Sequence, residues 1–175
     1  KIFGGSKSEK DVKKIAPIVS GSNEFFAKYA SLSNDELRAK SADFKQRIKA
    51  YLTEIDAEIE QKKQDAEALP ETEISQRDAI YKEVDSLKKD RDKKIEEILE
   101  QIQPEAFAVV KETARRFKEN ENMVSTATAL DRELATKKNY ISIDGDQSTF
   151  KNTWLAAGGS ITWNMVHYDV QLIGG

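Results

Sequence analysis

The stretch that decides the fold is residues 69–72, Leu69-Pro70-Glu71-Thr72, a turn with a long periodic segment on each side. Upstream of it, apolar residues recur at spacings of three, four or seven, namely Leu37, Phe44, Ile48, Leu52, Ile55 and Ile59. Downstream, Arg91 interrupts a second stripe that comprises Ile80, Val84, Leu87, Ile95, Ile98 and Ile102. Stripes of this kind are typical of amphipathic helices. Two of similar length around one proline-containing turn predict an antiparallel helical hairpin.

A clear helix start precedes the first stripe. Ser33 is followed three residues later by Glu36, which is the spacing of a capping box. Asp35 and Glu36 also place negative charge in the first turn, where the helix dipole favours it. We expect this helix to run to about Ala68. The hairpin could bind a partner as a coiled coil or be two helices packed on each other, and the second requires fewer assumptions.

The segment before this helix contains a start signal and two interruptions. Ser8 and Asp11 have the spacing of a capping box for a short helix. Pro17 falls inside the apolar pattern and is expected to kink or end that helix. Residues 20–22, Ser-Gly-Ser, are expected to break it.

Four further elements follow the hairpin. Pro104 is expected to open a third helix as its first residue. Residues 125–137 could form one more helix, and residues 141–146, with their Asp-Gly pair, predict a small β-hairpin. Residues 156–160 are expected to be a flexible loop. The predicted fold is mainly α: a long antiparallel helical hairpin, shorter helices, and a small β-hairpin near residues 140–150.

Composition narrows the possible functions. The chain has 175 residues, of which 34% are charged, with only 3 Pro and 8 Gly, and this profile suits long solvated helices. A net charge of −3 gives no reason to expect nucleic acid as a partner. The absence of Cys excludes disulfides and thiolate chemistry, and a single His excludes a multi-histidine metal site within this chain. We expect a soluble, cytosolic protein, because no apolar run approaches the roughly 18 residues of a membrane span.

Three sets of residues resemble functional sites but lack residues that such sites require. Asp144, Asp146 and Ser148 have the spacing that begins a calcium loop, but the required Gly and Glu are missing, so a plain turn is expected. The Gly158-Gly159-Ser160 run lacks the Gly-Lys-Ser/Thr that would anchor a nucleotide phosphate. His167 has no nucleophile or carboxylate at a fixed spacing, which favours a structural role.

A basic amphipathic stretch lies near the start of the chain. Lys7, Lys10, Lys13 and Lys14 accompany several apolar residues and could contact an anionic membrane surface. A solvated helix face is the simpler interpretation, because Glu9 dilutes the positive charge. Because no catalytic set of residues can be assembled, residue chemistry alone indicates a non-enzymatic helical scaffold or coiled-coil interaction module.

Five short stretches add a resemblance to a known family. In chain order they are Lys1–Gly4 (KIFG), Leu32–Lys40 (LSNDELRAK), Phe44–Ile48 (FKQRI), Pro104–Glu112 (PEAFAVVKE) and His167–Gly175 (HYDVQLIGG). Together they closely resemble the amino-terminal region of the SecA family, the ATPase motors of bacterial protein export. The resemblance implies that residues 1–175 are the amino-terminal part of the first nucleotide-binding domain, an incomplete part of an α/β RecA-like motor domain.

The last stretch resembles the family's Q motif, which holds the adenine of ATP. Carried over by position, Gln171 would hydrogen-bond the adenine edge, and Met165 and Tyr168 would line or stack on the ring. A carboxamide presents a donor beside an acceptor, which matches the N6/N7 edge of adenine. Tyr168 stands where the family pattern has Phe, and Val166 stands where it has Arg.

The chain departs from the family pattern in two segments. Residues 49–102, the predicted helical hairpin, separate the Phe44–Ile48 stretch from the Pro104–Glu112 stretch, which follow each other closely in the family. Residues 119–164 separate the latter from the Q motif in the same way. We therefore expect two insertions, 49–102 and 119–164.

The resemblance also implies a larger protein with further functional motifs and partners. The Gly-Lys-Thr phosphate loop and the Mg²⁺-binding carboxylates of the family are not in these 175 residues, so we expect the chain by itself not to hydrolyse ATP. The implied partners are the SecYEG channel and preproteins, at the cytoplasmic face of the inner membrane, with lipid contacts through Lys10, Lys13 and Lys14. Apolar faces around Phe107, Val110, Trp154 and Trp163 are expected to promote self-association, which leaves a homodimer open.

Overall fold

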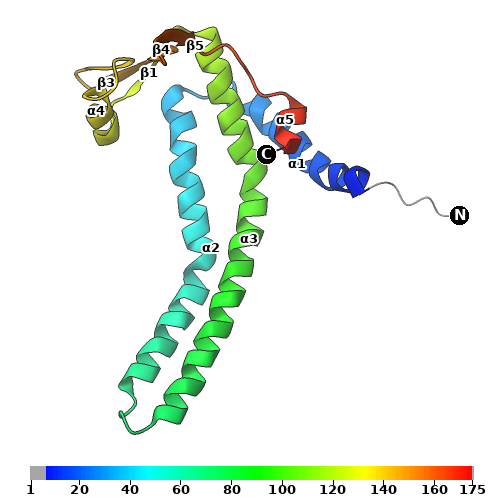
Figure 1. Ribbon diagram of the computed structural model, residues 1–175, viewed down its shortest axis with the longest axis vertical. Coiled ribbons are helices and arrows are strands. Elements are labelled where there is room, and N and C mark those ends of the chain that lie inside the picture. The colour runs from blue at the N-terminus through cyan, green and yellow to red at the C-terminus, as the bar shows by residue number, and fades with distance from the viewer. Residues whose placement is uncertain (1–6, 175) are drawn as a thin grey trace, which may run out of the picture. The chain divides into compact units, whose positions relative to one another are not determined.

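The computed structural model describes residues 7–174, with side chains described from Lys13 onward (Figure 1). The helices are α1 (Lys7–Tyr29), α2 (Asn34–Ala68), α3 (Ile74–Glu119), α4 (Ala129–Ala135) and α5 (Asp169–Gly174). The strands are β1 (Asn122–Thr126), β2 (Ile141–Asp144), β3 (Gln147–Lys151), β4 (Thr153–Ala156) and β5 (Gly159–Thr162). The predicted mainly α fold with small antiparallel strands is therefore confirmed.

The described chain divides into two compact units. One is the helical hairpin Ala42–Ile102, formed by most of α2 and the first part of α3. The other unit combines the described residues on either side of that hairpin, so α1, all the strands, α4 and α5 belong to it. The division falls within two continuous helices rather than at flexible linkers.

The hairpin has the predicted apolar seam. Its core consists of Leu52, Ile55, Ile59 and Val84, with Ile48, Leu87 and Ile95 packed against it. Arg91 interrupts the seam without leaving an unpaired charge, because its Nε donates to Asp56 Oδ1 across the hairpin at 2.5 Å. The helix ends also follow the prediction, since α2 ends at Ala68 and α3 begins at Ile74.

The capping box at the start of α2 is confirmed. Ser33 Oγ accepts from the amide of Glu36 at 3.2 Å, and Glu36 Oε2 accepts from the amide of Ser33 at 2.7 Å. These two bonds satisfy backbone donors that the first turn of a helix leaves free. Hydrogen bonding of the Glu36 carboxylate with the backbone amide of Ser33, and then with its side chain, lowers the pKa of Glu36.

The prediction that Pro104 opens a new helix is wrong. Helix α3 is 46 residues long and continues through Pro104. A proline inside a helix removes one backbone hydrogen bond, so the carbonyl of Glu100 loses its donor. Packing in the second unit favours the continuous helix nevertheless: a Cβ built on Gly21 of α1 would lie 3.3 Å from Pro104 Cβ, so the ring fills the space that the glycine leaves.

The expected break at residues 20–22 is also wrong, and for the same reason. Helix α1 runs without interruption through Pro17, Gly21 and Ser22. Gly21 permits the close approach of Pro104, and Ser22 is fully buried. Small residues that look like a helix break in sequence are here a helix contact. The stretch Lys1–Gly4 and the side chains of Ser8 and Asp11 lie outside the described residues.

Residues 119–164 form two small antiparallel sheets. The first has the strand order β1-β3-β2, and the second is the hairpin β4-β5. The predicted β-hairpin at residues 141–146 is confirmed, with Gly145 in its turn at a φ of 55°. The helix expected over 125–137 begins only at Ala129, because Ser125 and Thr126 pair with β3.

The expected flexible loop at residues 156–160 is a tight turn between β4 and β5. Ala156 pairs with Gly159, so the turn consists of Ala157 and Gly158 alone. Both have positive φ angles, 50° and 81°, as a two-residue hairpin of the primed type requires. Gly158, which in sequence suggests a flexible loop, instead allows the strands to reverse direction through its positive φ angle.

The second unit is held together around Arg116 of α3, which is buried. Its guanidinium donates to the carbonyls of Tyr29 and Leu32 at 3.0 and 2.6 Å, to Asn34 Oδ1, and to Glu112 Oε1. These bonds fasten the turn between α1 and α2 onto α3. An apolar cluster of Tyr29, Leu37 and Ala108, together with Phe25, Phe26, Leu32 and Val109, lies in the same unit.

Candidate functional site

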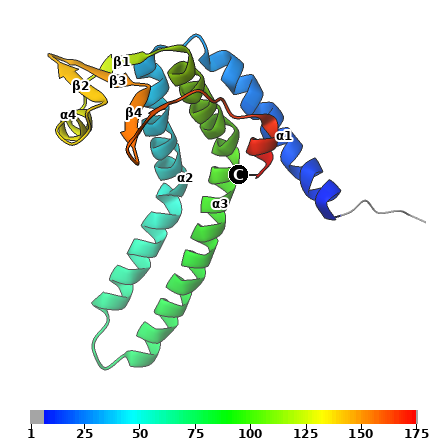
Figure 2. The ribbon, with the colours of Figure 1, turned by 45° about the horizontal axis from the view of Figure 1, so that its top comes forward.

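The predicted Q-motif residues lie in and just before α5. In Figure 2 the red segment after the strands crosses α3, and α5 then lies beside α1. Trp163 fastens the crossing segment, because its Nε1 donates to the carbonyl of Ala114 on α3 at 3.1 Å and to that of Met165 at 2.8 Å. Leu172 is buried at the other end. The segment that contains the predicted site residues is thus held at both ends.

Gln171 has a defined orientation. Its side-chain Oε1 accepts from the backbone amide of Tyr168 at 2.9 Å, and the backbone amide of Gln171 donates to the carbonyl of Tyr168. This is the glutamine half of a capping box, in which the third residue of a helix reaches back to the residue that precedes it. Within the described residues, Nε2 of Gln171 donates to no other group. An acceptor lone pair and two donor hydrogens therefore remain side by side.

Tyr168 and Met165 are both accessible. Tyr168 is 74% exposed and Met165 is 40% exposed. Tyr168 and Gln171 are brought together through the hydrogen bond to the Tyr168 amide, whereas Met165 is linked to this pair only along the chain. The three residues occupy an open surface rather than a closed cavity.

Asp169, at the first position of α5, is the centre of a polar cluster that sequence reasoning missed. Both of its carboxylate oxygens accept from Asn23 Nδ2 of α1 at 3.1 Å, and Oδ1 also lies 3.3 Å from Lys111 Nζ of α3. Lys111 Nζ in turn donates to Asn23 Oδ1 at 2.7 Å. Hydrogen bonds from Asn23 and then from Lys111 lower the pKa of Asp169.

A sequence signal for this cluster does exist. Lys111 lies four residues after Phe107 and three before Ala114, so it interrupts the apolar face of α3. A lysine on such a face requires a partner, because burying an unpaired charge is costly. In the structure Lys111 is only 9% exposed. Its partner, Asp169, is distant in sequence and could not be named from spacing.

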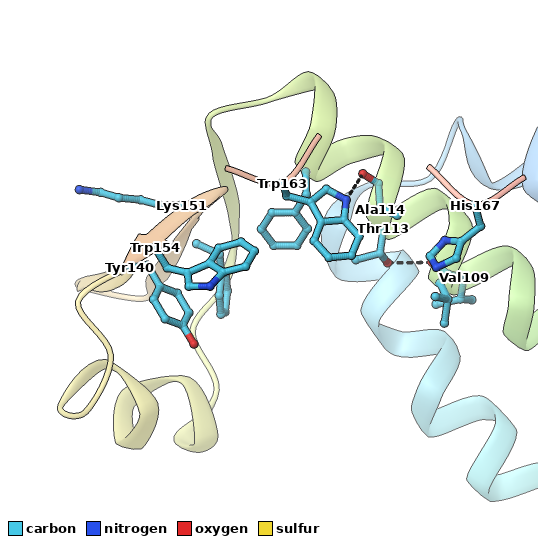
Figure 3. A pocket seen from close by; sticks show the side chains of 11 residues that line it. Val109, Thr113, Ala114, Tyr140, Lys151, Trp154, Trp163 and His167 are labelled. Atoms are coloured by element: carbon cyan, nitrogen blue, oxygen red, sulfur yellow. Dashed lines mark hydrogen bonds between the residues drawn. The ribbon is translucent and has the colours of Figure 1, made fainter. Parts of the chain in front are cut away.

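A separate apolar cavity of about 490 Å³ is lined by none of the predicted site residues Gln171, Tyr168 and Met165 (Figure 3). It is lined by Val109, Val110, Thr113, Ala114, Phe117, Tyr140, Phe150, Lys151, Trp154, Trp163 and His167. Val110 is 53% exposed, and the two tryptophans are half-buried. The predicted exposed apolar face is thus present around Val110, while self-association stays a prediction.

His167 lies at the edge of this cavity, on the segment that leads to Tyr168. Its Nδ1 is buried and has no hydrogen-bond partner among the described residues. The cavity lining contains no carboxylate, and its hydroxyl groups are those of Tyr140 and of Thr113, which donates to the carbonyl of Val109. The lone histidine therefore belongs to an apolar wall.

The remaining candidate residues have structural positions. Asp144 pairs with Gln147 at the end of the β2-β3 hairpin, and Ser148 is buried against Ser125, so the calcium-like spacing is a turn. No group of three or more acidic or histidine residues that could hold a metal ion occurs in the described part of the chain. Lys13 and Lys14 are exposed, and the side chain of Lys10 lies outside the described residues. Among residues 7–174 no helix is long and apolar enough to cross a membrane.

Comparison with known proteins identifies the family. All 175 residues match the family model described as the SecA DEAD-like domain, so the chain belongs to this family. It is 49% identical to the protein translocase subunit SecA of Flavobacterium psychrophilum, 45% identical to that of Parabacteroides distasonis and 46% identical to that of Amoebophilus asiaticus. Each alignment covers the whole chain, but the chain spans only 15–16% of these relatives. No solved structure matches it.

Proposed function

We propose that this chain is the amino-terminal part of the first nucleotide-binding domain of an ATP-driven motor that moves preproteins through the SecYEG channel. The observation that supports this proposal most directly is the match of the SecA DEAD-like family model to all 175 residues. The relatives that cover the whole chain are named protein translocase subunit SecA. Their greater length leaves ample chain for the other parts of such a motor.

The proposed role of Gln171 is to bind the adenine of ATP. Adenine presents a donor at N6 beside an acceptor at N7, and the unused lone pair and amide hydrogens of Gln171 complement both. The hydrogen bond to the Tyr168 amide leaves this pair of groups available and limits rotation of the carboxamide. Tyr168 offers an exposed aromatic face for stacking, and Met165 offers a flexible apolar contact beside it.

The phosphate chemistry of the proposed motor needs groups outside these residues. Phosphoryl transfer depends on a phosphate-loop lysine and on Mg²⁺, which neutralise the charge that develops on the phosphate oxygens. The Gly-Lys-Thr sequence of such a loop does not occur in the 175 residues. We propose that this chain by itself contributes adenine recognition and does not hydrolyse ATP.

Segments 49–102 and 119–164 are proposed as two insertions within the domain. They differ in whether they form a separate compact unit. The first contains nearly all of the separate hairpin unit Ala42–Ile102. The second is bonded to the start of α2: Asp35 accepts from the amide and hydroxyl of Thr126, and Asn34 Nδ2 donates to the carbonyl of Val124. The alignments with the relatives include both segments, so both are shared with those proteins.

The proposed location is the cytoplasmic face of the inner membrane. Exposed Lys13 and Lys14, with Lys10 on the same helix, would supply a basic contact for anionic lipid headgroups. Each lysine near such a surface contributes about 1 kcal/mol, so this contact of three lysines would assist binding to the channel rather than replace it. We also propose that two copies of the protein can associate through the exposed apolar face around Val110.

ATP turnover by the full-length protein tests the proposed function. In Gln171→Ala we expect the preference for ATP over GTP, measured as the ratio of kcat/KM values, to fall by about tenfold or more, because a bidentate contact to a base contributes about 1–3 kcal/mol of discrimination. Gln76→Ala, at an exposed position of the hairpin, is the matched control and should leave the ratio unchanged. An unaltered ratio in Gln171→Ala would remove adenine recognition from this residue, and absence of ATPase activity in the wild type would refute the motor assignment.

A further inference from the structure

Helix α5 cannot orient Gln171 without help from the rest of the unit. It has only six residues, and isolated helices of this length are not stable in water. The orientation of its side chains must therefore come from contacts with other elements. The described contacts are the buried side chain of Leu172 and the bonds of Asp169 with α1 and α3.

The geometry of α5 separates these anchors from the proposed adenine contacts. Residues three apart lie on one face of a helix, so Asp169 and Leu172 share a face, as do Tyr168 and Gln171. Asp169 and Leu172 make the contacts with the unit, while Tyr168 is 74% exposed. The anchoring face and the proposed binding face are thus different sides of the same short helix.

Lys111 is the buried member of the cluster around Asp169. Its side chain is 11% exposed and its Nζ lies 5.1 Å from the centre of the Phe26 ring, so most of its water shell has been removed. The amide of Asn23 and the carboxylate of Asp169 replace that water, at 2.7 and 3.3 Å. Asn23 also donates to Asp169, so each of the three residues is bonded to the other two.

We propose that Asn23, Lys111 and Asp169 form a positioning cluster that sets adenine specificity by fixing the helix start on which Gln171 is oriented. This inference rests on the proposed role of Gln171. None of the three residues touches Gln171 through its side chain in the described contacts, so they act through the backbone of α5. Loss of the cluster would free the Tyr168–Gln171 cap to rotate relative to α1 and α3. The nucleotide would still reach the phosphate-binding groups but would lose its base contact.

Two variants of the full-length protein test the cluster. Asp169→Asn and Lys111→Met remove the charge pair and keep the approximate shape of each side chain. In both we expect the ratio of the Kd for GTP to the Kd for ATP to fall about tenfold toward the value of Gln171→Ala, while the Kd for GTP and kcat at saturating ATP change less than about twofold. Lys111→Arg, which keeps the charge, should retain most of the preference. Lys118→Met, an exposed lysine of the same helix as Lys111, is the matched control.

A double variant distinguishes positioning from general stability. If the cluster acts through Gln171, Asp169→Asn should have no further effect on the ratio in a Gln171→Ala background, because coupled residues are not additive. An additive loss would overturn the proposal, as would a preference for ATP that survives both Asp169→Asn and Lys111→Met while Gln171→Ala abolishes it. If Gln171→Ala itself leaves the preference intact, the proposed function fails first. The unchanged Kd for GTP serves as the folding control in every variant.

Discussion

Asp131 shows how a buried carboxylate is kept charged in this chain. Its side chain is 3% exposed and accepts from Arg38 Nη2 through both oxygens at 2.9 Å, from the amide of Thr128 at 2.9 Å and from Ser148 Oγ at 3.4 Å. Burial by itself raises the pKa of this carboxyl, but the hydrogen bonds from Thr128 and Arg38 outweigh it, and the pKa of Asp131 is lowered. The ionised form therefore stabilises the fold.

Asp131→Asn is expected to lower the free energy of unfolding by about 2–3 kcal/mol near neutral pH, because Arg38 loses its charged partner. A lowered pKa in the folded state means that the stabilisation is complete above the unfolded value of about 3.9 and is lost as the pH falls through the folded value. The wild type should therefore lose more stability than the variant between about pH 5 and pH 3. Urea-induced unfolding at several pH values measures both effects.

Asp146→Asn is the control for Asp131→Asn, since the Asp146 side chain is fully exposed at the tip of the β2-β3 hairpin. We expect its unfolding free energy to stay within about 0.5 kcal/mol of the wild type. Equal losses in the two variants would contradict the role assigned to the buried carboxylate.

Among the elements, the β4-β5 hairpin contains a residue in an unfavourable conformation. Ala157 has a φ of 50°, in the left-handed region, which costs a residue with a Cβ about 1–2 kcal/mol. Asparagine tolerates this region better than alanine. Ala157→Asn is therefore expected to raise the unfolding free energy by about 0.5–1 kcal/mol, measured by urea-induced unfolding.

The neighbouring position gives the control for this hairpin prediction. Ala156 lies in β4, where asparagine is disfavoured, so Ala156→Asn should not stabilise the chain. Stabilisation by both substitutions would mean that a surface effect, rather than the turn conformation, is responsible.

Helices α1 and α3 show where local signals mislead at the scale of elements. Pro17 and Pro104 each remove a backbone hydrogen bond, and Gly21 weakens a helix, so all three predict interruptions. Gly21 and Pro104 instead meet each other, and the contact between α1 and α3 favours helical backbone at both positions. A contact between residues so far apart in sequence cannot be deduced from either stretch alone.

For the whole molecule, the division into two units predicts independent local stability. Val84 is 1% exposed in the hairpin core, and Val84→Ala should destabilise the hairpin by about 1–3 kcal/mol through the lost burial and the cavity left behind. Amide hydrogen exchange should then accelerate across residues 42–102, while the amides of residues 103–174 should exchange as in the wild type.

Val110→Ala, at an exposed position of α3 in the other unit, is the control for Val84→Ala and should leave exchange in the hairpin unchanged. Faster exchange throughout both units in Val84→Ala would show instead that the chain unfolds as a single cooperative body.

Much of the architecture was predictable because its signals are local. The apolar stripes, the Ser33–Glu36 cap, the Pro70 turn and the Asp-Gly turn at residue 145 each act over a few residues, and all four are confirmed. The site was predictable only in part. The resemblance of residues 167–175 to the Q motif identifies Gln171 as a candidate, but no pattern in that stretch points to Asn23 or Lys111 as partners of Asp169.

Periodicity, capping residues and turn residues suffice for the helical hairpin and for the β2-β3 hairpin, because those elements depend on residues close together along the chain. Contacts between distant residues decide the rest: the continuity of α1 and α3, the pairing of Thr126 with Asp35, and the anchoring of α5 through Lys111. The physical reason is that a buried charge, a close helix contact or a six-residue helix is stable only when its partner is in place. That partner is supplied by folding and not by the neighbouring sequence.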